Sequence, residues 1–144
     1  MWQIATVSLR ELVDAVDFVS LSDTGEFPAY ICTKTGTIYY VSDDPKLNQD
    51  NPVDLEDSEQ YISVPSKRDL DLGRNVVNDF VDRELPDEWD TVRDFFHRRG
   101  AYRRFKDFLE FRGLLEKWFR FEEQSAAAAV RAWAADNEIP LSEP

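Results

Sequence analysis

The hexapeptide Tyr61-Ile62-Ser63-Val64-Pro65-Ser66 divides this chain into a part that predicts strands and a part that predicts helices. Three of its first four residues are β-branched or aromatic, which predicts a short strand that ends at Pro65. The chain after Ser66 carries apolar residues at helical spacing. We therefore expect an α+β fold, in which an N-terminal helix and a small three-stranded antiparallel sheet are followed by a four-helix C-terminal layer.

One helix and two further strands are predicted before this point. Ser8-Leu9-Arg10-Glu11 has the sequence of a capping box, and apolar residues follow it at helical spacing. Residues 28–33 and 37–41 are β-branched and aromatic runs separated by Lys34-Thr35-Gly36, which predicts a β-hairpin. With the strand before Pro65, the chain has the three strands that a stable sheet with one covered face requires.

Four helices are predicted after the hexapeptide. Ser66 with Asp69 forms a cap that opens the first helix, and Pro86 closes it. Asp87 caps the second, and Gly100 stops it. The apolar positions of the four helices are Leu70, Val76, Val77, Phe80 and Val81; Trp89, Val92 and Phe96; Tyr102, Phe105, Phe108 and Leu109; and Leu114, Leu115, Trp118, Phe119, Phe121, Val130 and Trp133. We expect the aromatic residues of the fourth helix to lie in the core.

The length of 144 residues predicts one domain. Its parts are residues 1–65, a helix and sheet with an acidic loop at 42–59; residues 66–138, the helical part; and a tail, residues 139–144. Aromatic residues make up 13% of the chain and charged residues 32%, which is typical of a folded core under a heavily charged surface.

The charge is strongly negative and unevenly distributed. The formal net charge is −12 at pH 7. Residues 1–92 contain 7 Lys/Arg and 20 Asp/Glu, whereas residues 93–120 contain 9 and 4. A net charge of this sign opposes sequence-blind binding to nucleic acid or to an anionic membrane. We expect no membrane partner.

A basic and aromatic island at Arg98–Phe108 is the strongest functional signal. On a helix that starts near Ala101, Arg103 and Lys106 lie three residues apart and share a side, beside a neighbouring stripe that faces the core. Arg104 points away from that side, and Arg99 joins it only if the turn at Gly100 places it there. The candidate partner-binding residues are Arg99, Arg103, Arg104 and Lys106. The alternative is that these cations pair with Asp107, Glu110 and the acidic part of the same molecule.

Other chemistry-bearing residues are few. His97 is the only histidine and Cys32 the only cysteine, so one chain assembles no Ser-His-Asp or multi-histidine site, no intrachain disulfide and no cysteine zinc cluster. We expect no metal, no cofactor and no catalytic residue, and a location in a reducing cytoplasm without export signal or membrane span. Residues 42–59 lack the glycine and the spacing of a calcium loop, and we interpret them as a mobile, solvated acidic loop.

The chain resembles an uncharacterised bacterial protein family, UPF0158. The resemblance is carried by three stretches: Tyr61-Ile62-Ser63-Val64-Pro65; Arg99-Gly100-Ala101-Tyr102-Arg103-Arg104-Phe105-Lys106-Asp107; and Trp118-Phe119-Arg120-Phe121 with the alanine-rich helix through Trp133. It covers most of the chain. It implies a bacterial cytoplasmic protein and brings no established reaction.

These observations favour a non-enzymatic interaction or regulatory module over an enzyme. The basic and aromatic helical face would bind an acidic protein or a nucleic acid, and we favour the acidic protein because of the net charge. Two alternatives remain open. One is an acidic nucleic-acid mimic that uses the loop at 42–59; the other is an enzyme of unknown class that uses two converging carboxylates.

Overall fold

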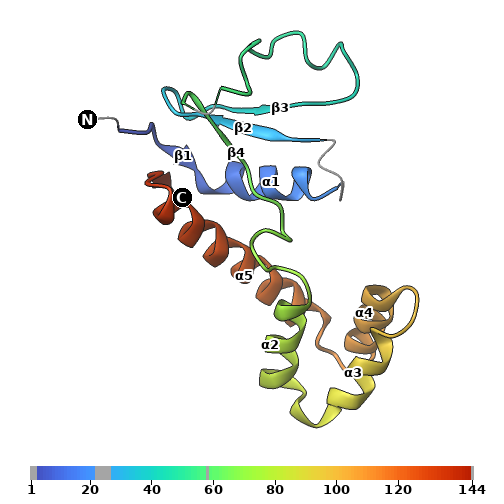
Figure 1. The fold of residues 1–144 in the computed structure, drawn as a ribbon. Helices are drawn as coiled ribbons and strands as arrows, with labels where there is room; N and C mark the ends of the chain where they lie inside the picture. Colours follow the sequence, from blue (N-terminus) through green and yellow to red (C-terminus); the bar gives the residue numbers. More distant parts are fainter. Residues whose placement is uncertain (1–2, 22–26, 58, 144) are drawn as a thin grey trace. The chain divides into compact units, whose positions relative to one another are not determined.

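The computed structural model describes residues 3–21, 27–57 and 59–143, and it has an α+β fold (Figure 1). About 48% of the described residues are helical and 10% are in strands, which confirms the predicted class. The chain gathers into two compact units: residues 1–72 with 126–144, and residues 73–125. The organisation as a single domain stays a prediction. Ser58 of the predicted acidic loop and Pro144 of the predicted tail lie outside the described residues.

The first unit contains the predicted three-stranded antiparallel sheet. Its strands are β2 (Ala29–Cys32), β3 (Ile38–Tyr40) and β4 (Tyr61–Ser63), in the order β3-β2-β4. Strand β2 is central, and its Ile31 lies opposite Ile38 of β3 and opposite Ile62 of β4. The hairpin and the strand before Pro65 therefore form as the sequence predicts.

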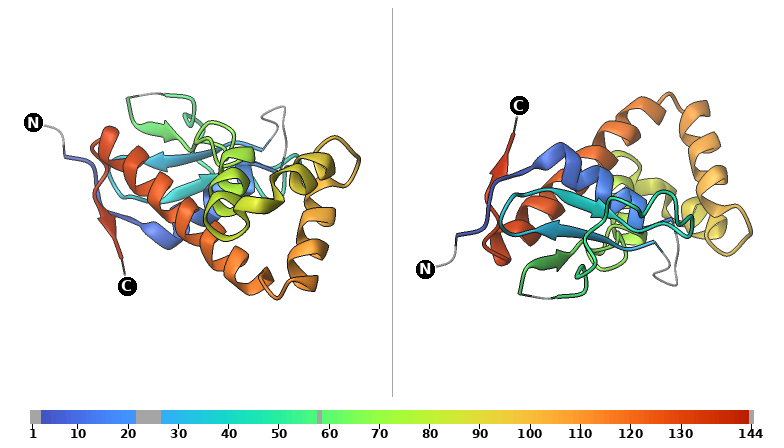
Figure 2. Two further views of the ribbon diagram at one scale, coloured as in Figure 1. Left: turned by 90° about the horizontal axis from the view of Figure 1, so that it is seen from below. Right: turned by 90° about the horizontal axis from the view of Figure 1, so that it is seen from above.

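Helix α1 (Leu9–Val19) covers one face of this sheet (Figure 2). The Glu11 N–H donates to Ser8 Oγ over 3.3 Å, so this half of the predicted capping box forms. Apolar residues of α1 recur every three or four positions and face the sheet, as helical periodicity requires. The buried residues of this core are Val7, Leu9, Leu12, Ala15, Val16, Val19, Ala29, Ile31, Val64, Val130, Ala134 and Ile139.

Two short strands at opposite ends of the sequence pair with each other. Strand β1 (Val7–Ser8) runs parallel to β5 (Leu141–Ser142), with Val7 opposite Leu141. The two strands lie side by side in both views of Figure 2. The segment from residue 139 onward, predicted as a tail, thus holds a strand and the buried Ile139.

The described part of the acidic loop, residues 42–57 and Glu59, consists of turns and bends without helix or strand. The Asn48 side chain binds the backbone of Ser42 twice: its Oδ1 accepts from the Ser42 N–H at 2.9 Å, and its Nδ2 donates to the Ser42 carbonyl at 2.6 Å. Asn51 Nδ2 donates to the Tyr40 carbonyl at 2.8 Å. Leu55 is buried against Tyr61 and Cys32 on the face of the sheet away from α1. The predicted mobility of the loop stays a prediction.

The second unit is helical. It consists of α2 (Arg74–Glu84), the 3₁₀ turn η1 (Pro86–Glu88), α3 (Trp89–Phe95), α4 (Ala101–Phe111) and the first part of α5 (Leu115–Asp136). Four aromatic rings fill its core. The Trp118 ring lies 5.3 Å from Phe80 and 5.1 Å from Phe105, and Phe80 lies 5.4 Å from Phe121, all in edge-to-face geometry.

The predicted start of the first of these helices at Ser66 is wrong. Ser66 and Asp69 do form the reciprocal hydrogen bonds of a cap, at 3.0 and 3.1 Å. They cap only a single turn, because Asp71 adopts a left-handed conformation with φ of 55° that a helix cannot continue through. Helix α2 begins eight residues later, at Arg74.

Candidate functional site

The two units carry very different charge. Residues 1–72 and 126–144 contain 6 Lys/Arg and 17 Asp/Glu, whereas residues 73–125 contain 11 and 12. The negative charge of the chain therefore resides almost entirely in the first unit. Within the second unit the cations gather on α4, on the turn before it and on the start of α5.

Aromatic packing positions α4 and the turn that precedes it. The Phe95 ring lies 5.5 Å from Phe108, and Phe96 lies 5.1 Å from Tyr102, so the end of α3 is fixed against α4. Gly100 adopts a left-handed conformation with φ of 69°, which separates the turn from the helix as predicted. Phe105 and Leu109 are fully buried on the inner side of α4. Charged residues occupy the outer, solvent-facing side of α4.

The four predicted residues divide between two sides of this helix. Arg103 and Lys106, three residues apart, are neighbours. Lys106 Nζ lies 5.9 Å from the centre of the Phe119 ring of α5, a cation–π contact. Arg104 lies roughly 160° around the helix from Lys106 at 3.6 residues per turn. Its Nε donates to the Arg99 carbonyl over 3.1 Å, so Arg104 is joined to the turn.

Counter-charges within the second unit bind other cations. The ion pairs there are Arg98–Asp94 at 3.2 Å, Arg112–Glu88 at 2.8 Å and Lys117–Glu84 at 2.8 Å. Among the described residues of this unit, none of the four predicted cations forms an ion pair with Asp107, Glu110 or another carboxylate. Arg99, Arg103 and Arg104 are exposed, and Lys106 is half-buried. Within the unit, the alternative of local neutralisation has no support.

Two phenylalanines outside the predicted site are exposed on α4 and α5. Phe111 at the end of α4 is 88% exposed. Phe119 is 46% exposed, so its predicted place in the core is wrong, whereas Trp118 is buried and Phe121 is half-buried as core residues. Both exposures follow from helical angles: Phe111 lies about 120° from Phe105, and Phe119 about 100° from Trp118. We call Arg99, Arg103, Arg104, Lys106, Phe111 and Phe119 the basic-aromatic surface.

The sequence comparison identifies the family. Residues 5–142 match the model of an uncharacterised protein family, UPF0158. The chain belongs to UPF0158. No curated protein and no solved structure gives a significant match. The family assignment extends over both units, and it confirms the resemblance carried by the strand before Pro65 and by the basic-aromatic helix.

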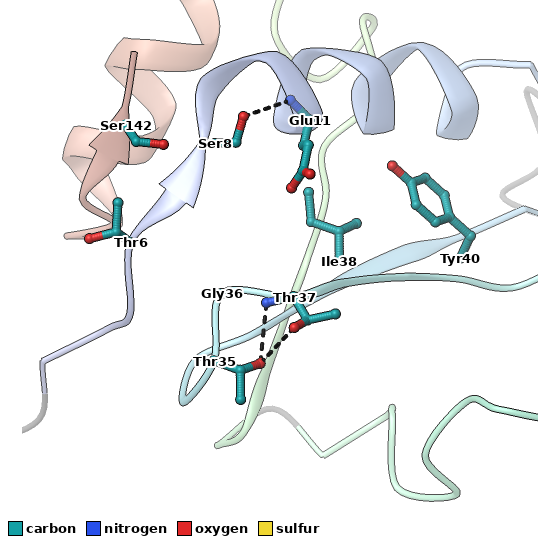
Figure 3. Close-up of a pocket in the computed structure, with 9 residues that line it drawn as sticks. All are labelled: Thr6, Ser8, Glu11, Thr35, Gly36, Thr37, Ile38, Tyr40 and Ser142. Atoms are coloured by element: carbon teal, nitrogen blue, oxygen red, sulfur yellow. Dashed lines mark hydrogen bonds between the residues drawn. The ribbon is translucent and has the colours of Figure 1, made fainter. Parts of the chain in front are cut away.

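The first unit of this UPF0158 protein contains a hollow of about 560 Å³ with a largely hydroxylic lining (Figure 3). Its lining residues are Thr6, Ser8, Glu11, Thr35, Gly36, Thr37, Ile38, Tyr40 and Ser142. Burial, together with the charges of Asp14 and Glu11, raises the pKa of the Tyr40 hydroxyl. Glu11 is the single carboxylate in the lining. The hollow therefore does not provide the two converging carboxylates that a carboxylate-based enzyme requires.

Residues with metal-binding or nucleophilic chemistry lie apart. In the described ranges, no three His, Cys, Asp or Glu side chains are grouped so that they could hold a metal ion. His97 is exposed in the turn after α3. Cys32 is buried; burial raises the pKa of its thiol, but hydrogen bonds from Thr35 and from the backbone at Lys34 and Thr35 lower it more, to a net value below the ordinary one. None of the helices described is long and apolar enough to cross a bilayer.

Proposed function

We propose that this UPF0158 protein is a non-enzymatic interaction module of the bacterial cytoplasm, and that its basic-aromatic surface binds an acidic surface of another protein. One observation carries the proposal. Arg99, Arg103 and Arg104 are exposed and Lys106 half-buried, and all four lack a carboxylate partner inside their unit. Lys106 contacts the Phe119 ring, which is exposed, as is Phe111 at the end of the same helix as Lys106. Aromatic residues and arginine are enriched in protein interfaces. Aromatic rings supply contact area, and a guanidinium group binds a carboxylate through two parallel hydrogen bonds.

The charge of the whole molecule favours protein over nucleic acid as the partner. At −12, the chain repels phosphate over distances of about a Debye length, roughly 8 Å at physiological salt. An acidic protein is repelled as well, but its contact area includes apolar groups that bind Phe111 and Phe119. The exposed phenylalanines can therefore bind apolar groups of a protein partner, and this contribution is not reduced by the repulsion between two negatively charged molecules.

The test is a charge reversal with a matched control. The test variant is Arg103→Glu, Arg104→Glu and Lys106→Glu; the control is Arg10→Glu, Lys34→Glu and Arg93→Glu, three exposed cations outside the surface. Both change the net charge equally. We expect the test variant alone to lose the proteins that the immobilised wild type captures from the native cell, and free polyglutamate to compete with that capture. Equal capture by wild type and test variant would contradict the proposal.

Nucleic acid is the other outcome of this test. If it is the partner, single- or double-stranded DNA or RNA will bind the wild type at low salt, and the logarithm of the affinity will fall with the logarithm of salt concentration, with a slope of about −0.7 to −0.9 per phosphate contacted. We expect no such binding. Binding with that slope, lost in the test variant and kept in the control, would replace the acidic protein by nucleic acid.

A further inference from the structure

Four of the large exposed hydrophobic side chains lie on two surfaces of opposite charge. On the basic-aromatic surface they are Phe111 and Phe119. On the acidic loop they are Leu47, which is 68% exposed, and Val53, which is fully exposed. Exposed apolar groups framed by charge mark contact surfaces more often than scattered single residues do.

The acidic loop has the charge that the basic-aromatic surface requires. Residues 42–59 contain seven Asp/Glu and a single cation, Lys46. They are Asp43, Asp44, Asp50, Asp54, Glu56, Asp57 and Glu59. Asp44 and Asp57 accept hydrogen bonds from the backbone N–H groups of Lys46 and Glu59, and Asp57 and Asp54 accept from the side chains of Gln60 and Tyr61, just beyond the loop. The described carboxylates of this segment form no ion pair. The loop thus presents carboxylates that are free to bind cations.

The loop presents Val53 beside a hollow. A cavity of about 390 Å³ lies between the loop and the sheet, and its lining includes Tyr30, Val41, Pro52, Val53 and Leu55. The Asn48 and Asn51 hydrogen bonds hold this segment against the end of β3. The lining of the cavity also includes Asn48, Asn51 and one carboxylate, Glu56. A hollow with apolar walls and a carboxylate accommodates an aromatic ring that has a cation on the same face of its helix. Phe111 is such a ring, because Arg104, seven residues before it, lies on the same face of α4 about two turns away.

We infer that the acidic loop of one copy of this chain binds the basic-aromatic surface of a second copy. The inference rests on the proposed function, because it identifies the acidic partner of the same surface. Charge complementarity and the exposed apolar groups on both surfaces argue for it. In the closed form of this contact, a dimer with two-fold symmetry, each loop binds the basic-aromatic surface of the other copy.

The test uses complementary charge reversals in the full-length chain, measured by sedimentation equilibrium. Variant A is the Arg103→Glu, Arg104→Glu, Lys106→Glu protein. Variant B is Asp43→Lys, Asp50→Lys, Glu56→Lys, Glu59→Lys, which reverses the net charge of residues 42–59. We expect the wild-type mass to rise with concentration from 16.8 kDa toward twice that value. A alone and B alone stay monomeric, because like charges face each other in both contacts. An equimolar mixture of A and B restores the dimer, because every contact again joins opposite charges.

A second pair of variants tests the same contact without charge reversal, in case variant A or variant B fails to fold. Leu47→Ser with Val53→Ser removes the apolar groups of the loop and should weaken dimerisation at least tenfold. Leu21→Ser, another exposed aliphatic position, is the matched control and should leave it unchanged.

The outcomes separate this inference from the proposed function. A wild type that stays monomeric at every concentration, a mixture of A and B that stays monomeric, or a variant A that still dimerises would each overturn the inference. In those cases loss of cellular capture by variant A still supports the proposed function. If variant A both dimerises and captures the same proteins as wild type, the inference and the proposed function fail together.

Discussion

The turn of the hairpin lies directly on the N-terminal segment, because Gly36 packs against the backbone carbonyl of Thr6. A Cβ on Gly36 would overlap the Thr6 carbonyl oxygen, which is a backbone atom and has no side-chain freedom to move away. Gly36 also has φ of 76°, a left-handed conformation that other residues adopt at a cost. Two separate constraints thus require glycine at this position.

We predict that Gly36→Ala lowers the free energy of unfolding by roughly 2–4 kcal/mol, since strain at positive φ and a backbone overlap add. Urea denaturation followed by circular dichroism measures it. Gly113→Ala is the matched control: φ there is 72°, but a Cβ would meet open space. Gly113→Ala should lower the free energy of unfolding by about 1 kcal/mol, because only the left-handed backbone conformation opposes the alanine there. Equal effects of the two substitutions would show that the contact with Thr6 contributes nothing.

Trp118 offers a test of the second unit. Its side chain is 1% exposed, and its Nε1 has no hydrogen-bond partner among the described residues. Trp118→Phe removes that unpaired donor and keeps a ring against Phe80 and Phe105, so we predict a loss of less than about 2 kcal/mol. Trp118→Ala, which leaves a cavity, should cost about 3–5 kcal/mol. Circular dichroism in urea provides the comparison, and a Phe variant as unstable as the Ala variant would refute the account.

Acid should weaken the contact that holds the C-terminal strand to α5. Arg131 Nη2 lies 2.7 Å from Glu143 Oε1, and this hydrogen bond lowers the pKa of the Glu143 carboxyl below its ordinary value. A carboxylate with a lowered pKa in the folded state stabilises that state above the unfolded pKa, and the contribution disappears as the pH falls through the folded value. The Glu143 contribution is therefore present at neutral pH and lost below the ordinary pKa of 4.5.

Titration of the Glu143 side-chain carboxyl carbon by NMR measures this shift. We predict that Arg131→Gln moves the midpoint upward, whereas Arg120→Gln, a control at another exposed cation of α5, leaves it in place. An unchanged Glu143 midpoint in Arg131→Gln would mean that the ion pair does not form in solution.

Local sequence signals predicted most of the fold, because they concern neighbouring residues. The strand before Pro65 and the hairpin turn at Gly36 are local patterns, and both form. The pairing of β1 with β5 was missed, since two strands of two residues each, separated by most of the chain, have no pattern of their own. The Ser66–Asp69 cap misled the prediction of α2 because a cap satisfies the same donors whether or not a helix continues beyond it.

The candidate surface was predictable in part. Spacing alone placed Arg103 beside Lys106 and turned Arg104 away from them. That the four cations form no ion pair within their unit depends on where Asp94, Glu84 and Glu88 meet other cations, which is a tertiary property. The exposure of Phe119 was missed because spacing among the aromatics of α5 does not show how wide the buried stripe is.

The hydrogen bonds of Asn48 make the order of the acidic loop testable. Both bonds join its side chain to the Ser42 backbone, so Asn48→Ala removes both and leaves the loop attached through Asn51. Each such bond contributes about 0.5–1.5 kcal/mol, so local opening should become about tenfold more frequent. Lys46 is the single trypsin site within 42–57, and cleavage after it reports that opening.

We therefore predict that limited trypsin digestion cuts Asn48→Ala after Lys46 about tenfold faster than wild type, in proportion to the more frequent opening. Gln49→Ala, at an exposed neighbouring residue for which the structure shows no side-chain hydrogen bond, should be cut at the wild-type rate. Mass spectrometry of the fragments identifies the site. If the wild type is already cut after Lys46 as fast as Asn48→Ala, the two hydrogen bonds do not order the loop in solution, and its predicted mobility is confirmed instead.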